Sequence, residues 1–380
     1  MLTAADVRFV RSFRMPIEVA GTDASWGTGL ALRRVDGEVR LFSSTVREVV
    51  YEVRAADGAL VRAWGDVTSA ARVLDGAGRG GGSLRGLFWD EATQRLWWTY
   101  GDGYNTASGN DPSVGCSRLD AATGTGRPDG VWRFADRSCK MTMGGVLAVP
   151  PTHASSFGGR RLAAGMGGYF SIATTGPVSM GPALTAFDPA EALRTATAGA
   201  VTNTPLVGYP FTGAPDGTVD RCHRDTDYRT EFDAWTPNGN VGFFTWTDYI
   251  GQAGVWIDTP AVHGVLMMPT LGHGRVWYET STLHAERVTH DWLVLDPAQL
   301  AQVAAGQRPQ WSVQPTTSWT MQYPGIAYPQ PGWANEPFNM VVGSVYDPID
   351  ARLYVAVRDP WSPNHPDAGH VIAVYDIATT

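Results

Sequence analysis

A four-strand repeat occurs five times along the 380 residues and constrains the fold more than any other feature of the chain. Each copy has a glycine leading into an apolar strand, a turn, a second apolar strand, a long connection, a third strand that ends in an aromatic residue or Leu and then Asp, and a fourth strand. The repeat is clearest at Gly86–Asp90 with Arg95–Trp98, and at Gly343–Asp347 with Arg352–Val355. Repeats of this size are supersecondary units that bury their faces against one another.

Four short strands per unit are typical of the blades of a β-propeller. We therefore predict an all-β chain, a five-bladed β-propeller that forms a single domain over residues 1–380. The expected strands are 29–33, 39–43, 49–53 and 59–64 in blade 1; 84–90, 95–100, 115–120 and 130–134 in blade 2; 145–149, 161–165, 183–188 and 205–209 in blade 3; 254–258, 264–268, 292–296 and 310–314 in blade 4; and 343–347, 353–357 and 371–376 in blade 5.

The predicted fifth blade has no fourth strand of its own. Val7–Phe13 alternates like a strand and precedes blade 1 without partners. We predict that it pairs as the outer strand of blade 5 and closes the ring, which removes an exposed sheet edge; the alternative is a frayed N-terminal arm. Residues 211–253 are predicted to be a long insertion between blades, with a sixth blade as the alternative, and residues 316–342 form a second long connection.

Two short helices are expected between the third and fourth strands of blades 3 and 4. Asp188–Leu193 and Asp296–Ala301 begin alike, with Asp as the N-cap and Pro in the first turn. Glu191 and Gln299 stand where they would complete a capping box.

Composition excludes several classes of protein and location. The formal net charge of −8 argues against a nucleic-acid partner, and no apolar run approaches the ~20 residues of a membrane span. Lys140 is the only lysine, which is typical of a GC-rich bacterial genome. No signal peptide is visible in the sequence. We expect a secreted or periplasmic protein whose signal has been removed.

The sequence has three cysteines, Cys116, Cys139 and Cys222. Either one disulfide forms, Cys116–Cys139 or Cys139–Cys222, or all three are free thiols.

The strand order of such a fold places its connections. Those between strands two and three, and those from one blade to the next, emerge on one face, here termed the long-loop face; it receives nearly every long, polar and aromatic connection, where binding residues concentrate. His153 and His263 fall on the opposite face and are expected to be structural. The candidate catalytic residues are Asp23, Asp102, Asp248, Tyr249 and His290, and the candidate substrate-binding residues are Trp26, Tyr104, Arg221, His223, Trp246, Tyr278, Glu336 and Arg358.

These residue types suit two reactions. Asp248 could act as a general acid or base if burial raises its pKa, with Trp246 and Tyr249 stacked on a sugar ring; the alternative is a turn aspartate beside core aromatics. In the loop from His273 to His290, His, Tyr and Arg together could abstract a proton next to a carboxylate, as a polysaccharide lyase requires, since the unperturbed pKa of His lies near neutrality. Exposed loop histidines are the alternative reading of that segment.

Asp225 and Asp227, at alternate spacing, suit a calcium loop but lack the remaining ligands of an EF-hand. A solvated loop with internal ion pairs is the alternative. Calcium is therefore the one cofactor that we consider, and no phosphate-binding loop, dinucleotide fingerprint or nucleophile elbow is present.

Asp23, just before the first strand of blade 1, resembles the first catalytic aspartate of five-bladed glycosidases of the arabinanase and fructosidase type. The resemblance implies further carboxylates on the next two blades. Asp102 could serve on blade 2, whereas blade 3 has Met166–Tyr169 and no acid. Such carboxyl pairs stand ~5 Å apart for retention or ~6.5–9.5 Å apart for inversion.

The preferred hypothesis is a monomeric carbohydrate-active enzyme that cleaves glycosidic bonds of an oligo- or polysaccharide, by hydrolysis rather than elimination. A non-catalytic glycan- or protein-binding propeller is one alternative. A metal-dependent, lactonase-like hydrolase with calcium in the central channel is another. The connections differ sharply from blade to blade, which favours one asymmetric site over the repeated pockets of a lectin.

Overall fold

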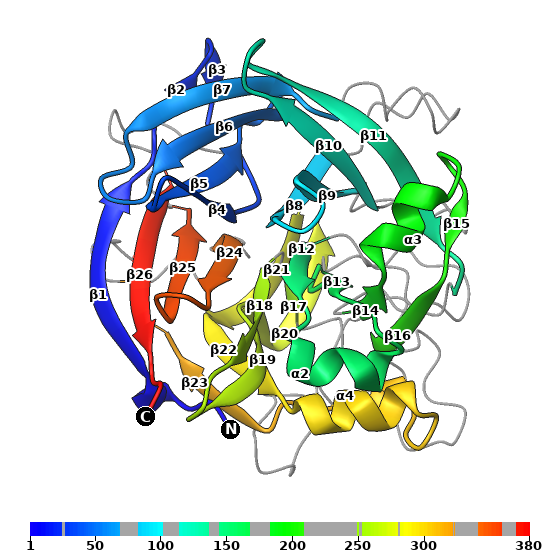
Figure 1. The fold of residues 1–380 in the computed structure, drawn as a ribbon. Helices are drawn as coiled ribbons and strands as arrows, with labels where there is room; N and C mark the ends of the chain where they lie inside the picture. Colours follow the sequence, from blue (N-terminus) through cyan, green and yellow to red (C-terminus); the bar gives the residue numbers. More distant parts are fainter. Residues whose placement is uncertain are drawn as a thin grey trace.

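In the computed structural model, five units of four antiparallel strands surround a common centre and form a five-bladed β-propeller (Figure 1). The short strand β15 (Ala200–Val201) adds a parallel fifth strand at the outer edge of blade 2. The described residues are 1–24, 27–68, 83–101, 114–136, 144–167, 183–208, 249–250, 253–279, 282–321, 323, 341–358 and 370–380. Blade 1 consists of β4 (Ala31–Val35), β5 (Glu38–Ser44), β6 (Val49–Arg54) and β7 (Leu60–Asp66), and blade 2 of β8 (Ser83–Asp90), β9 (Arg95–Gly101), β10 (Val114–Asp120) and β11 (Thr125–Phe134). Blade 3 consists of β12 (Gly145–Ala148), β13 (Leu162–Gly165), β14 (Leu184–Phe187) and β16 (Asn203–Val207), and blade 4 of β18 (Gly254–Asp258), β19 (His263–Met267), β22 (Asp291–Leu295) and β23 (Thr317–Thr320). Blade 5 consists of β24 (Val341–Asp347), β25 (Arg352–Val357), β26 (Val371–Ile377) and β1 (Val7–Arg14).

The N-terminal strand closes the ring, as predicted. β1 pairs antiparallel with β26 from Val7 opposite Ile377 to Arg14 opposite Val371. The two termini lie close together in Figure 1 as a result. The ring of Phe9 packs edge-on against Tyr375, with 5.8 Å between ring centroids. This strand leads directly into blade 1 and so joins the first blade covalently to the last.

One predicted strand is wrong. Residues 310–314 were expected to be the outer strand of blade 4, but Gln310–Ser312 is a 3-10 helix and the strand is β23. The side chain of Arg308 explains the turn, because its Nε and Nη2 donate to the hydroxyl and carbonyl oxygens of Ser312, each over 2.7 Å. The remaining predicted strands agree with the structure to within a few residues, apart from the start of β11, which begins earlier.

The two predicted helices are present as α3 (Pro189–Arg194) and α4 (Pro297–Ala304). In each, the N-cap aspartate accepts a hydrogen bond from the second residue after it, Ala190 or Ala298. The capping boxes do not form. The Glu191 carboxylate accepts instead from the backbone N–H of Thr202, 3.0 Å away, which ties α3 to the chain beyond it.

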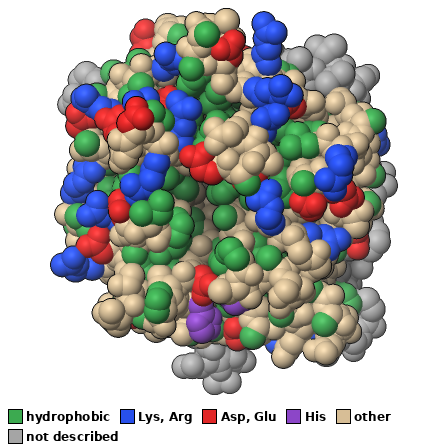
Figure 2. Space-filling model, viewed as in Figure 1, with side chains coloured by type: hydrophobic (Ala, Val, Ile, Leu, Met, Phe, Trp, Pro, Cys, Tyr) green, Lys and Arg blue, Asp and Glu red, His purple; other side chains and the backbone are tan. Residues whose placement is uncertain are grey.

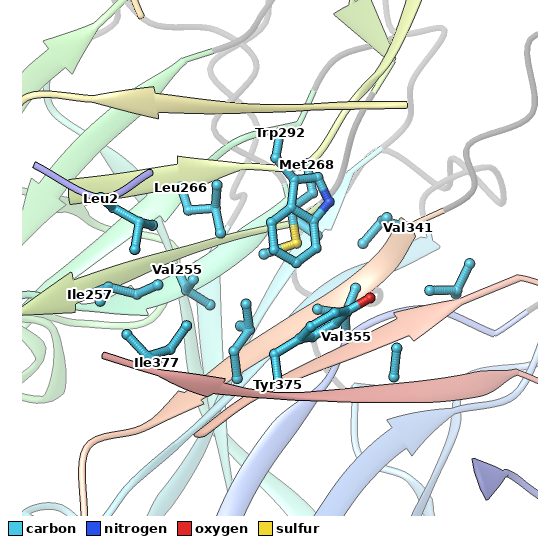
Figure 3. Close-up of a cluster of buried hydrophobic side chains, with 14 of the residues drawn as sticks. Leu2, Val255, Ile257, Leu266, Met268, Trp292, Val341, Val355, Tyr375 and Ile377 are labelled. Atoms are coloured by element: carbon cyan, nitrogen blue, oxygen red, sulfur yellow. The ribbon is translucent and has the colours of Figure 1, made fainter. Parts of the chain in front are cut away.

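The core is divided into five hydrophobic clusters, and each fills the space between two neighbouring blades. Figure 3 shows the cluster between blades 4 and 5, where Val255, Leu266 and Trp292 face Val355 and Tyr375. Each blade buries its faces against its neighbours, so neighbouring blades stabilise one another.

Every blade has a glycine before or within the first few residues of its innermost strand, and close approach of backbones explains why. A Cβ atom on Gly86 would contact the carbonyl group of Gly144 in the next blade, and one on Gly343 would lie 2.6 Å from the carbonyl carbon of Gly29. The full set is Gly29, Gly86, Gly145, Gly254 and Gly343.

An aspartate ends the innermost strand in blades 2, 4 and 5, and it joins blades on the face opposite the long loops. Asp90 pairs with Arg161 of blade 3 over 3.4 Å, and Asp347 pairs with Arg34 of blade 1 over 2.5 Å. Asp258 accepts from the hydroxyl of Thr152 in α2 (Pro151–Ala154) over 2.5 Å. Figure 2 shows acidic and basic side chains interspersed around a hydrophobic centre. This aspartate is therefore structural in all three blades.

Cys116 is a buried free thiol, and burial raises its pKa. The Cys116–Cys139 bridge is therefore wrong; Cys139 and Cys222 lie outside the described residues. Within the described ranges, no helix is both long and apolar enough to cross a bilayer.

Candidate functional site on the long-loop face

Strand order fixes which connections share a face. In every blade the second strand ends, and the third begins, on the long-loop face, and the first strand of the next blade also starts there. The helices α2, α3 and α4 all lie in connections of the opposite face. The rigid inner strands therefore hold the ends of the variable connections around one opening.

Three titratable residues occupy the same position in three consecutive blades of the ring. Glu48 precedes β6 in blade 1, His290 precedes β22 in blade 4, and His370 precedes β26 in blade 5. Glu48 and His370 are buried, and His290 is partly buried. The equivalent residue of blade 3 is Ala183. Blades 4, 5 and 1, which are neighbours in the ring, thus each carry an ionisable residue at the start of the third strand on this face.

His290 lies at the base of a hairpin. Its Nδ1 stands 3.2 Å from the hydroxyl of Thr270, and its carbonyl accepts from the N–H of Met321 over 2.8 Å. Burial lowers the pKa of His290 to about 4, with the charge of Asp291 opposing the shift. The imidazole is therefore neutral near pH 7 and is a weak base. The proton-abstraction hypothesis assumed instead that its pKa lies near neutrality.

The segment from His273 to His290 was interpreted as a loop, but it belongs to a long β-hairpin. β20 (Thr270–Glu279) pairs with β21 (Thr282–Thr289), and β17 (Tyr249–Ile250) pairs with β20. Tyr249 stands opposite Leu271, and Tyr278 stands opposite Leu283.

Blade 5 places two basic residues at the same end. Arg358 follows β25 and His370 precedes β26, and the adjacent residues Val357 and Val371 are paired. The carbonyl of His370 accepts from the N–H of Met15 over 2.8 Å, at the point where the closing strand leaves blade 5. Arg358 and His370 thus lie at the ends of the two central strands of blade 5, on the long-loop face.

Asp23 lies in a short hairpin of β2 (Glu18–Val19) and β3 (Thr22–Asp23), and its side chain is exposed. Its carbonyl accepts from the N–H of Val46 over 2.9 Å. Since Val46 belongs to the connection between β5 and β6, this contact places Asp23 on the long-loop face beside blade 1. It stands in the hairpin before the innermost strand rather than on that strand.

The other candidates lie outside the described residues. They are Trp26, Asp102, Tyr104, Arg221, His223, Asp225, Asp227, Trp246, Asp248 and Glu336. Among the residues that the structure does describe, no group of three or more His, Cys, Asp or Glu side chains is arranged to hold a metal ion.

Glu48 and His370 were missed by the sequence reasoning. Neither belongs to a motif that is recognisable in the sequence. Alignment of the five repeats on their third strands gives the missing signal, because it places Glu48, His290 and His370 in one column.

Two buried residues on this face have a strained backbone. Of the seven non-glycine residues with positive φ in the described ranges, only Glu48 (φ 62°) and Met166 (φ 63°) are buried. Met166 follows β13 and contacts the position where Gly254 would carry a Cβ. Strained residues persist where the surrounding structure holds them, and they cluster at functional sites.

No protein-family model matches the chain, and no curated protein is significantly similar to it. Similar solved structures include a putative glycoside hydrolase from Parabacteroides distasonis, with 10% identity, 99% of this chain and 95% of that chain covered, and a TM-score of 0.44. An alpha-L-arabinanase mutant from Cellvibrio cellulosa has 8% identity, 92% and 90% coverage, and a TM-score of 0.42. A gluconolactonase from Xanthomonas campestris has 14% identity, 98% and 95% coverage, and a TM-score of 0.29. The assignment of this chain to the five-bladed propellers rests on its own strand topology.

Proposed function

We propose that the protein is a carbohydrate-active enzyme that hydrolyses glycosidic bonds at the long-loop face. The observation that carries the proposal is the arc of Glu48, His290 and His370 on three consecutive blades, bordered by Arg358 and by Asp23. Five different sets of connections start and end around this one opening, which favours a single asymmetric site. Binding and catalytic residues are concentrated on such loops when a rigid scaffold holds them.

Hydrolysis is favoured over elimination by the state of His290. A lyase base must accept a proton near neutral pH, whereas burial lowers the pKa of this imidazole to about 4. The proposed acid and base are therefore carboxylates, with Asp23, Asp102 and Asp248 as candidates and an oligo- or polysaccharide as substrate.

The test is a panel of arabino-, xylo- and cello-oligosaccharides and their parent polysaccharides. We expect new reducing ends with at least one substrate and no unsaturated product. Asp102→Asn and Asp248→Asn should each lower the rate by at least about a hundredfold, as loss of an acid or base does. Asp36→Asn, in an exposed turn of the opposite face, is the matched control and should keep the wild-type rate.

Three outcomes would decide against the proposal. Binding of a glycan without cleavage would support the non-catalytic propeller, and an unsaturated product would support a lyase. A calcium-dependent activity on lactones, checked by elemental analysis of the purified protein, would support the lactonase-like alternative.

A further inference from the structure

We propose that Glu48 is a positioning residue that joins the end of blade 1 at Thr68 to the start of blade 2 at Leu84 on the long-loop face. That the ligand is a glycan rests on the proposed function. The role of Glu48 rests on its hydrogen bonds in the structure. The connection leaves blade 1 after Thr68 and returns at Ser83, the first residue of β8. Oε2 of Glu48 accepts from the hydroxyl of Thr68 over 3.1 Å, and Oε1 accepts from the N–H of Leu84 over 3.3 Å. One carboxylate therefore joins the two ends.

The return point is held from a second side as well. The carbonyl of Leu84 accepts from the hydroxyl of Thr28 over 2.5 Å, and the backbone N–H of Thr28 is held by Ser44 over 3.1 Å. Thr68 is fixed in turn, because its N–H and its hydroxyl each lie 2.9 Å from Oδ1 of Asp66. These contacts form a polar seam between blades 1 and 2 on the long-loop face, and Glu48 is the residue that links its two halves.

The choice of Glu at this position is costly for the fold. The backbone adopts φ 62°, where a residue other than glycine is strained by about 1 kcal/mol. The side chain is only 6% exposed, and an ionisable group removed from water is unfavourable unless it is hydrogen-bonded. Glycine would relieve the strain and remove the buried carboxyl together. The presence of Glu therefore points to the task that its two oxygens perform.

Glutamine separates a positioning role from a charge role. In Glu48→Gln, the amide oxygen can accept from the N–H of Leu84, and the amide NH₂ can donate to the hydroxyl of Thr68, which then turns its own proton to Asp66. This variant thus keeps both contacts without the charge, whereas Glu48→Met keeps the bulk and loses both. Glu52 is the matched control, since it is a buried glutamate of β6 that does not belong to this seam. Its carboxylate pairs with Arg33, 2.7 Å away.

The experiment measures glycan affinity by calorimetry, using the best-bound oligosaccharide of the panel, together with backbone hydrogen exchange at Leu84. For Glu48→Met we expect affinity at least about tenfold weaker and faster exchange at Leu84, with Glu48→Gln close to wild type in both. Glu52→Gln should lower the melting temperature but leave affinity and exchange at Leu84 unchanged. Equal losses in Glu48→Gln and Glu48→Met would overturn the positioning role and indicate that the charge acts directly.

The exchange measurement keeps the two proposals apart. If the wild-type protein binds no glycan, the proposed function fails, and exchange at Leu84 still decides whether Glu48 holds the connection. If wild type binds glycan and Glu48→Met binds equally well, the positioning role fails while the proposed function stands.

Discussion

At the scale of single residues, His290 makes the stability of the fold depend on pH. Its pKa is about 4 in the folded protein, below the unfolded value of 6.5, so the unfolded chain binds the proton more readily between these values. Its contribution is complete above about pH 6.5 and is lost as the pH falls toward 4, by at most about 3 kcal/mol. We expect urea unfolding to show this decline in wild type and a flatter profile in His290→Gln.

The control for this titration is His263→Gln, an exposed histidine of the opposite face. Its pH profile should follow that of wild type. A wild-type profile that His290→Gln leaves unaltered would show that His290 is not buried in its neutral form.

Residue chemistry was predictable from the sequence where a motif repeats, and not where a residue stands alone. The N-cap role of Asp188 and Asp296 followed from Asp–Pro at the start of both helices, and the structure confirms it. The pKa of His290 did not follow, because burial depends on which strands surround the ring. Glu48 was missed since its two partners, Thr68 and Leu84, lie 20 and 36 residues away.

At the scale of elements, the approach of neighbouring inner strands depends on glycine. In Gly86→Ala, the new Cβ would contact the carbonyl group of Gly144, which is backbone and cannot rotate away. We expect a loss of about 3 kcal/mol or more in the free energy of unfolding, because the inner strands must separate. Gly124→Ala is the control: its Cβ would meet nothing within 4 Å, and only its positive φ of 67° opposes the change, at a cost of about 1 kcal/mol.

Chemical denaturation of both variants measures the difference. A Gly86→Ala protein as stable as Gly124→Ala would mean that the inner strands of blades 2 and 3 do not approach as closely as the structure indicates.

Most elements were predictable because the repeat combines two signals, strand alternation and turn residues. The outer strand of blade 4 was misplaced where these signals competed. Residues 310–314 alternate as a strand would, but Arg308 bonds to Ser312 and closes a 3-10 turn. The hairpin of β20 and β21 was not predicted, because it lies between β19 and β22 and has no counterpart in the four-strand repeat.

At the scale of the whole molecule, the closing strand has two separable effects. β1 completes the sheet of blade 5, and it also joins that blade covalently to blade 1, where the side chain of Arg11 donates to the carbonyls of Ala55 and Ala56. Deletion of residues 1–14 removes both effects. Val7 lies opposite Ile377, so a circular permutant that carries residues 1–14 after residue 380, and begins at Met15, keeps the complete sheet and loses only the covalent link.

We therefore expect an order of melting temperature in which wild type exceeds the permutant and the permutant exceeds the deletion. The deletion exposes the edge of β26 and leaves Tyr375 without the ring of Phe9, and an unpaired edge also promotes aggregation. The permutant should keep the oligomeric state of the wild type, because its blades still bury all five hydrophobic clusters. If the permutant unfolds as early as the deletion, stability depends on the covalent closure of the ring and not on the completed sheet. If it matches wild type, packing between blades 5 and 1 closes the ring without help from the chain.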